Sequence, residues 1–512
     1  MNCAIELRDI TKTFGSVVAN SRVCLSLNRG EILALLGENG SGKTTLMNMI
    51  AGIYYPDSGE IFVDGNEVSI SSPKDAFTLG IGMIHQHFKL VDVLTASENI
   101  ILGLPGHGRL DRKKLSAEIL EISQKYGFEL DPNKKVYDMS VSEKQTVEIV
   151  KVLYRGASIL ILDEPTAVLT PQEAGKLFDV LRNMKKDGKA IVIITHKLNE
   201  VMDISDKVAV LRRGEYIGTV NTAETDSQSL TDMMVGHKVN LDIERPPVKN
   251  AVDRLLVSEL SCTSVDGVKV LNNVSFCARS GEILGIAGVA GSGQRELCEA
   301  IAGLYKVDSG SIRYTPPRDG KERELVGRDP LSIQRLGVSL AFVPEDRLGM
   351  GLVAGMGMVG NMLLRSYRNG KSPFTDTKPG LALAQDVVEK LEVSTPSVST
   401  PVSRLSGGNV QKVLLGREIA SSPSVIMAAY PVRGLDINSS YTIYHLLNQQ
   451  KEKNVAVIYV GEDLDVLLEL CDRVLVLCGG EVSGIVDARS ATKEQIGTLM
   501  TQKNSEMREG GK

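Results

Sequence analysis

A glycine-rich segment near the N-terminus carries the residues with the clearest chemical potential. It has the spacing G-x-x-x-x-G-K-[ST], follows the apolar run 32–36 and leads into a helical stretch at 45–50. Glycines let successive backbone N–H groups face phosphate oxygens, the lysine ammonium neutralises the β- and γ-phosphates, and the next hydroxyl ligates Mg²⁺. The sequence therefore predicts a nucleotide-phosphate site formed by Gly37, Glu38, Asn39, Gly40, Ser41, Gly42, Lys43, Thr44 and Thr45.

Two acidic residues follow a second apolar run. Residues 159–162 are all Ile or Leu, and Asp163 and Glu164 come directly after them. A carboxylate at the end of a buried strand can hold Mg²⁺ through water, and its neighbour can polarise an attacking water molecule. Two surface acids that merely close a strand would leave the apolar run unexplained. We therefore predict ATP hydrolysis with Mg²⁺, in which Lys43 and Glu164 are catalytic and Thr44 and Asp163 hold the metal.

The chain contains two copies of one unit. Residues 30–33 recur 251 positions later as residues 281–284, and later landmarks recur at a larger offset because the second copy carries an insertion. Self-similarity of this kind indicates homologous domains. We expect a first domain at 1–240, a linker at 241–252, a second domain at 253–503 and a flexible tail at 504–512.

Within each copy, short β-branched runs such as 191–194 alternate with helical stretches, which is typical of a parallel sheet with helices on both faces. Between 111 and 128, apolar residues recur at helical spacing, which predicts an inserted helical subdomain. The predicted fold class is α/β, with two P-loop NTPase domains in tandem, each with a helical subdomain.

Composition excludes several other classes of protein. The chain has 512 residues, a net charge of −5 and 42% hydrophobic residues, which fits globular domains and provides no basic footprint for nucleic acid. Its seven cysteines never have the spacing C-x-x-C, which disfavours a zinc module or a disulfide framework. No apolar run approaches the ~18 residues of a membrane-spanning helix. We expect a soluble chain in a reducing cytoplasm.

These motifs resemble those of the ATPase subunits of ATP-binding-cassette (ABC) transporters, and specifically those with two cassettes in one polypeptide. The resemblance spans nearly the whole chain. It implies that Gln86 links Mg²⁺ and water to the permease contact, that His196 touches the γ-phosphate, and that Phe14 stacks on adenine. From the residues alone, Gln86 is an ordinary polar loop residue, His196 is a strand-end histidine, and packing of Phe14 in the core is an alternative.

The second copy lacks the corresponding chemical groups. Its phosphate loop has glutamine and arginine where the first has lysine and threonine, Ala429 and Tyr430 replace the two acids, and Glu462 replaces His196. Loss of the general base alone forfeits about 10² to 10⁴ in rate. We predict a degenerate site that retains the loop shape and could hold nucleotide without hydrolysis, with drift as the alternative; its residues are Gly288, Gly291, Ser292, Gly293, Gln294 and Arg295.

The signature sequences have the opposite pattern. The first copy has Ser140 but carries Ser142 where relatives of the resembled family usually have glycine. The resemblance implies that each ATP lies between the phosphate loop of one cassette and the signature of the other, so we expect one intact and one degenerate composite site. The intact signature belongs to the second copy: Leu405, Ser406, Gly407, Gly408 and Asn409.

Among twin-cassette ATPases, the chain looks like the importers of simple sugars and nucleosides. Segments 82–91 and 165–171 most resemble the nucleoside branch. The resemblance implies two integral-membrane permease subunits, an extracytoplasmic solute-binding protein or lipoprotein, and a peripheral location at the cytoplasmic face of the inner membrane.

Several alternatives stay open. The solute could be a sugar of the ribose or galactose type, or riboflavin, because the resembling segments face the permease or the nucleotide and not the solute. A soluble twin-cassette ATPase that acts on ribosomes or DNA is a further alternative. Such proteins tend to have two competent sites, long linkers or zinc modules.

Overall fold

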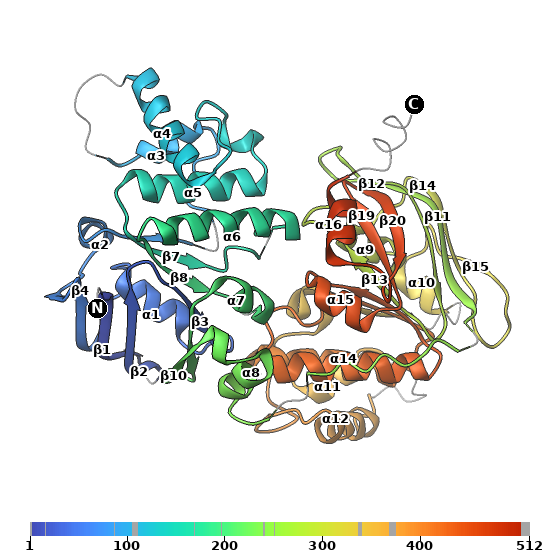
Figure 1. Ribbon diagram of the computed structural model, residues 1–512. Helices are drawn as coiled ribbons and strands as arrows, with labels where there is room; N and C mark the ends of the chain where they lie inside the picture. The colour runs from blue at the N-terminus through green and yellow to red at the C-terminus, as the bar shows by residue number, and fades with distance from the viewer. Residues whose placement is uncertain are drawn as a thin grey trace. The chain divides into compact units, whose positions relative to one another are not determined.

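The chain folds as two compact units, Met1–Asn240 and Leu241–Lys512, which are described separately (Figure 1). The computed structural model describes residues 3–15, 17–85, 88–104, 111–167, 169–195, 197–238, 241–249, 251–335, 340–367 and 375–502.

A ten-stranded sheet organises the first unit, in the order β5-β4-β1-β2-β10-β9-β3-β8-β7-β6. Strands β3, β8, β7 and β6 lie side by side in that order and are parallel. Strands β1, β2, β4 and β5 form an antiparallel arm. The strands are β1 (Cys3–Phe14), β2 (Val17–Asn28), β3 (Ile32–Leu36), β4 (Ser58–Val63), β5 (Asn66–Val68), β6 (Ile81–Ile84), β7 (Ile159–Asp163), β8 (Ala190–Ile194), β9 (Lys207–Arg212) and β10 (Glu215–Asn221).

Helices cover both faces of the parallel strands, so every residue of β3, β7 and β8 is buried. In Figure 1, α1 lies on one side of β7 and β8 while α5 and α6 lie on the other, and alternate strand residues pack into two separate apolar clusters. The helices are α1 (Lys43–Ile50), α2 (Pro73–Thr78), α3 (Ala96–Ile101), α4 (Arg112–Tyr126), α5 (Val141–Tyr154), α6 (Pro171–Lys186), α7 (Leu198–Ile204) and α8 (Ser227–Val235).

The predicted helical insertion is present between β6 and β7. Helices α3, α4 and α5 share a small apolar cluster that includes Ile100, Leu115, Ile119 and Val147. Asp111 caps α4 by accepting the backbone N–H groups of its first turn, which explains where the helix begins. The prediction of an α/β fold with a helical subdomain is therefore confirmed.

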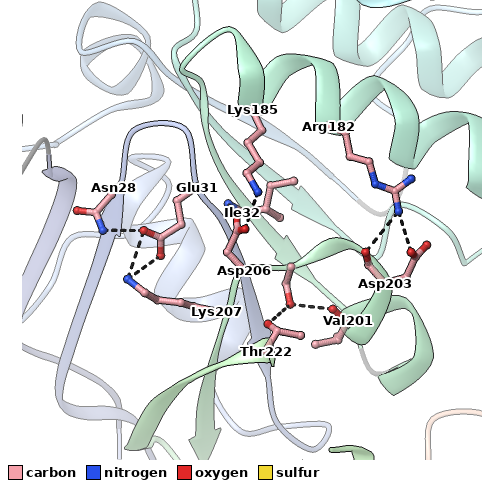
Figure 2. A network of polar contacts seen from close by, with 11 residues as sticks. Asn28, Glu31, Ile32, Arg182, Lys185, Val201, Asp203, Asp206, Lys207 and Thr222 are labelled. Carbon is pink, nitrogen blue, oxygen red and sulfur yellow. Dashed lines mark hydrogen bonds and ion pairs between the residues drawn. The ribbon is translucent and has the colours of Figure 1, made fainter. Parts of the chain in front are cut away.

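A polar network fixes the start of β3, at the opposite end of the strand from the phosphate loop (Figure 2). The Asp206 carboxylate accepts the backbone N–H of Ile32 at 2.9 Å and the Lys185 ammonium at 2.5 Å. The Glu31 carboxylate accepts a hydrogen bond from the Asn28 amide at 2.6 Å and forms an ion pair with Lys207 at 3.1 Å. These contacts hold the strand that delivers the phosphate loop.

The second unit repeats this plan with its strands in two sheets, β12-β11-β14-β15 and β16-β17-β18-β13-β19-β20. The strands are β11 (Asp253–Thr263), β12 (Lys269–Arg279), β13 (Ile283–Ala287), β14 (Ser309–Tyr314), β15 (Arg323–Glu324), β16 (Leu340–Val343), β17 (Val425–Ala429), β18 (Ala456–Val460), β19 (Arg473–Cys478) and β20 (Glu481–Asp487). The helices are α9 (Gln294–Ile301), α10 (Pro330–Arg335), α11 (Met358–Leu363), α12 (Lys378–Lys390), α13 (Gly407–Ala420), α14 (Ile437–Glu452), α15 (Leu464–Leu470) and α16 (Lys493–Thr501).

The network at the start of β3 recurs at the start of β13. Asp472 accepts the N–H of Ile283 at 2.9 Å and the Lys451 ammonium at 2.7 Å, and Glu282 pairs with Arg473 at 2.6 Å. Here the lysine and aspartate side chains are only 1% and 8% exposed. The contacts at the start of the central strand are thus retained in both copies, although the residues of the phosphate loops differ.

The segment expected to be a linker, 241–252, makes hydrogen bonds to the second unit. The Glu244 carbonyl accepts from Asn448, and Arg245 donates to the carbonyls of Leu468 and Cys471. Strand β11 then begins at Asp253. In the part of the chain that the structure describes, no helix is long and apolar enough to cross a membrane.

Candidate functional site

The predicted phosphate loop joins β3 to α1, at the carboxyl end of the parallel strands. Gly40 and Gly42 have φ angles of 80° and 94°, in the left-handed region that favours glycine. A Cβ at Gly42 would lie 2.2 Å from the Ala19 carbonyl oxygen, so only glycine fits against β2 there. Helix α1 begins at Lys43, earlier than the predicted Thr45, because Gly42 serves as its N-cap.

Lys43 lies within the loop and is only 8% exposed. Its ammonium donates to the carbonyl oxygens of Gly37 at 2.7 Å and Glu38 at 2.9 Å. Burial lowers its pKa, and the nearby carboxylates of Glu164 and Asp163 oppose that shift. The Lys43 ammonium thus lies near two carboxylates and donates to two carbonyl oxygens. A phosphate oxygen of a bound nucleotide could accept a further hydrogen bond from it.

Asp163 ends β7, directly beside the end of β8. Its pKa is raised to about 6 by burial first and then by the charge of Glu164, while Lys43 and a hydrogen bond with Thr44 act in the opposite direction. The structure therefore brings four of the predicted catalytic and metal-binding residues together.

Glu164 has a backbone conformation that few non-glycine residues adopt. Its φ is 47°, and its N–H donates to the Ile194 carbonyl at 2.8 Å, which carries the chain out of the sheet. Strained backbone of this kind clusters at functional sites.

This donor set fits Mg²⁺. The metal prefers carboxylate and hydroxyl oxygens and keeps several of its waters. Asp163 and Glu164 place two carboxylates beside one ammonium, and the exposed Thr44 hydroxyl bonds to Asp163. A divalent cation would favour the charged form of Asp163 and so oppose the burial and the repulsion from Glu164 that raise its pKa.

Phe14 lies at the end of β1 and is 45% exposed, which contradicts the alternative that it packs in the core. Its ring meets the Tyr54 ring edge to face, with centroids 5.3 Å apart, and the Lys12 ammonium lies 5.6 Å from its centroid. An exposed ring fixed from one side suits stacking on a base. The other two residues that the resemblance implied, Gln86 and His196, lie outside the described residues.

The second phosphate loop keeps the backbone of the first. Gly291 and Gly293 have φ angles of 83° and 96°. Gln294, at the position of Lys43, is buried and donates to the Val289 carbonyl at 3.2 Å. Arg295, at the position of Thr44, pairs along its own helix with Glu299 at 2.6 Å. The shape persists without the ammonium or the metal-binding hydroxyl.

Tyr430 has the same backbone conformation as Glu164. Its φ is 49°, and its N–H donates to the Val460 carbonyl at 2.9 Å. Burial is the main cause that raises the pKa of its hydroxyl, so it stays neutral. Ala429 ends β17 where Asp163 ends β7. These residues do not fit Mg²⁺.

Arg433, which sequence reasoning missed, contacts residues that stand where the first copy has its general base and histidine. It pairs with Glu345 and, at 3.8 Å, with Glu462, and its guanidinium carbon lies 5.9 Å from the centre of the Tyr430 ring. These residues come from three separate loops, so only their shared position relative to the first copy could have drawn attention to them.

The two signatures begin helices in both units. Ser140 caps α5 in a reciprocal pair with Glu143, and Ser142 is half-buried in the first turn. In α13, Ser406 is the cap, and the Asn409 amide donates to it at 2.9 Å. A Cβ at Gly408 would lie 2.7 Å from the Ser439 hydroxyl, so the close packing here depends on glycine.

The chain is similar to known proteins over nearly its whole length. A family model described as "ABC transporter" matches residues 21–167 and 271–431. The nucleoside import ATP-binding protein NupA of Lactococcus lactis is 41% identical, covering 98% of each chain. The guanosine import ATP-binding protein NupO of Bacillus subtilis is 40% identical, covering 100% of this chain and 99% of the relative.

A third relative, the glucose import ATP-binding protein TsgD13 of Haloferax volcanii, is 38% identical, covering 97% of this chain and 95% of the relative. Together with the paired phosphate loops and the buried acids at the ends of parallel strands, these matches place the chain in a family. It belongs to the ABC transporter family, as an ATPase component with two cassettes in one polypeptide.

Proposed function

We propose that this chain is the ATP-hydrolysing subunit of an importer for a small polar solute, that this solute is a nucleoside, and that only the first phosphate loop supports hydrolysis. The observation that carries the proposal is the cluster of Lys43, Thr44, Asp163 and Glu164, which has no counterpart in the second unit. Relatives named for nucleoside and guanosine import support the solute.

In this proposal, the phosphate loop binds the ATP phosphates through backbone N–H groups and the Lys43 ammonium. Thr44 and Asp163 hold Mg²⁺, which neutralises charge on the phosphates. Glu164 orients water and accepts its proton, and Phe14 stacks on the adenine. Gln86 and His196 take the metal-linking and γ-phosphate roles that the family resemblance implies.

The proposal includes partners and a location. Two membrane permease subunits would convert the ATP cycle into solute movement, and an extracytoplasmic solute-binding protein or lipoprotein would deliver the solute. The chain would then work as a peripheral protein at the cytoplasmic face of the membrane.

The decisive experiment measures ATP hydrolysis by the chain assembled with its permeases, with a panel of nucleosides, ribose, glucose and riboflavin as stimulants. We expect the largest stimulation with a nucleoside. Stimulation by a sugar or by riboflavin alone would replace the solute and leave the ATPase assignment intact. Copurification with ribosomes and not with permeases would contradict the importer.

A pair of variants tests the restriction to one hydrolytic site. Glu164→Gln should lower turnover by about 10² to 10⁴, because it removes the general base. Tyr430→Ala, at the matching position of the other copy, should change turnover less than about twofold. Similar losses from both variants would refute the proposal of a single hydrolytic site.

A further inference from the structure

A buried amide lies directly beneath the intact phosphate loop. Asn20, on β2, is 0% exposed, and its Nδ2 donates to the carbonyl oxygen of Gly42 at 3.3 Å. Its Oδ1 is also buried and has no hydrogen-bond partner among the described residues. A buried acceptor without a partner carries the full penalty of its lost hydration, so an apolar residue would suit folding better.

The second copy contains that apolar residue. Leu271, also 0% exposed, occupies the matching position on β12, and a Cβ at Gly293 would lie 2.7 Å from its Cδ2. The same fold therefore accepts leucine beside a phosphate loop. Asparagine stands only in the copy that keeps the lysine and the two acids, which points to a requirement of function.

The contact of Asn20 explains what that requirement is. The Gly42 carbonyl and the Lys43 N–H belong to one peptide plane, so a bond that holds the carbonyl also sets the direction of the N–H. That carbonyl accepts the first hydrogen bond of α1, from Leu46 at 2.9 Å. Asn20 adds a second donor from strand β2, which limits rotation of this peptide.

We propose that Asn20 is a positioning residue that orients the Gly42–Lys43 peptide N–H toward the phosphates of the bound nucleotide. The inference rests on the proposed function of the first phosphate loop. The N–H would contact phosphate both before and during hydrolysis. Loss of the bond that orients it should therefore weaken binding of substrate and transition state alike. The expected signature is a higher KM for ATP with nearly unchanged kcat.

The test compares Asn20→Leu with Asn448→Leu in the full chain. Asn448 is a matched control, since it is a buried asparagine in the second unit whose Nδ2 donates to one carbonyl and whose Oδ1 also has no partner among the described residues. We expect Asn20→Leu to raise the KM roughly three- to tenfold, the scale of one hydrogen bond, and to leave the unfolding temperature without nucleotide equal or higher. Asn448→Leu should leave the KM unchanged.

A second variant, Asn20→Ala, removes the same bond without adding bulk and should raise the KM to a similar extent. An unchanged KM in both Asn20 variants, or a rise in KM that appears only with a matching loss of stability, overturns the proposal. Lys43→Ala separates this result from failure of the proposed function. If Lys43→Ala keeps turnover, the site assignment itself is wrong, whereas lost turnover beside an unaffected Asn20→Leu refutes only the role of Asn20.

Discussion

Replacing Lys451 by methionine should destabilise the second unit far more than the same change at Lys185 destabilises the first. The two lysines make the same contact with an aspartate that caps the start of a central strand. They differ in burial: the side chains of Lys451 and Asp472 are 1% and 8% exposed, whereas those of Lys185 and Asp206 are 35% and 36% exposed.

The magnitudes follow from that difference. Removing one partner of a buried ion pair leaves an uncompensated charge, at about 3–5 kcal/mol. In the second unit, the Ile283 N–H would then be the one hydrogen-bond donor left to the Asp472 carboxylate among the described residues. An exposed pair contributes about 0–1 kcal/mol. At about 2–4 °C per kcal/mol for domains near this size, Lys451→Met should lower the unfolding temperature by about 6–20 °C and Lys185→Met by at most about 4 °C.

Calorimetry of the full chain would measure the shifts, and hydrogen exchange followed by mass spectrometry would identify the unit that opens. We expect faster exchange in β13 for Lys451→Met and little change in β3 for Lys185→Met. Equal shifts for the two variants, or a smaller one for Lys451→Met, would refute the argument that burial decides the strength of this contact.

Three further predictions concern the nucleotide site. Gly42→Ala should lower the unfolding temperature more than Gly40→Ala, because its Cβ would lie 2.2 Å from a carbonyl oxygen whereas a Cβ at Gly40 meets no protein atom within 4 Å; equal shifts in thermal unfolding would contradict this. Phe14→Ala should raise the KM for ATP roughly 5- to 150-fold, the equivalent of 1–3 kcal/mol of stacking, and Phe14→Tyr should restore it; steady-state kinetics would show an unchanged KM if the ring does not bind adenine. Gly408→Ser should reduce ATP turnover, since its Cβ would lie 2.7 Å from a neighbouring hydroxyl; full activity in a turnover assay would argue against a tight signature loop.

The parallel strands could be predicted closely because each is a short apolar run buried on both faces. Strand β3 has the expected bounds, Ile32–Leu36, and β7 extends the expected run by one residue. Helix α1 begins two residues earlier than expected. Its N-cap is a glycine in the left-handed conformation, and a glycine-rich sequence pattern predicts a loop there. The second unit's strands are divided between two sheets. That division depends on which strands pair across long stretches of sequence, and hydrophobic periodicity does not predict such pairing.

By itself, the sequence determined the duplication, the phosphate loop and the loss of lysine and acids from the second copy, because each is a local pattern of residue types at fixed spacing. Tertiary structure decided the rest. It set the burial that raises the pKa of Asp163, the exposure of Phe14, the contacts of Arg433 with two loops, and the placement of Asn20 under Gly42. These properties depend on which distant segments meet, and on how much water their meeting excludes.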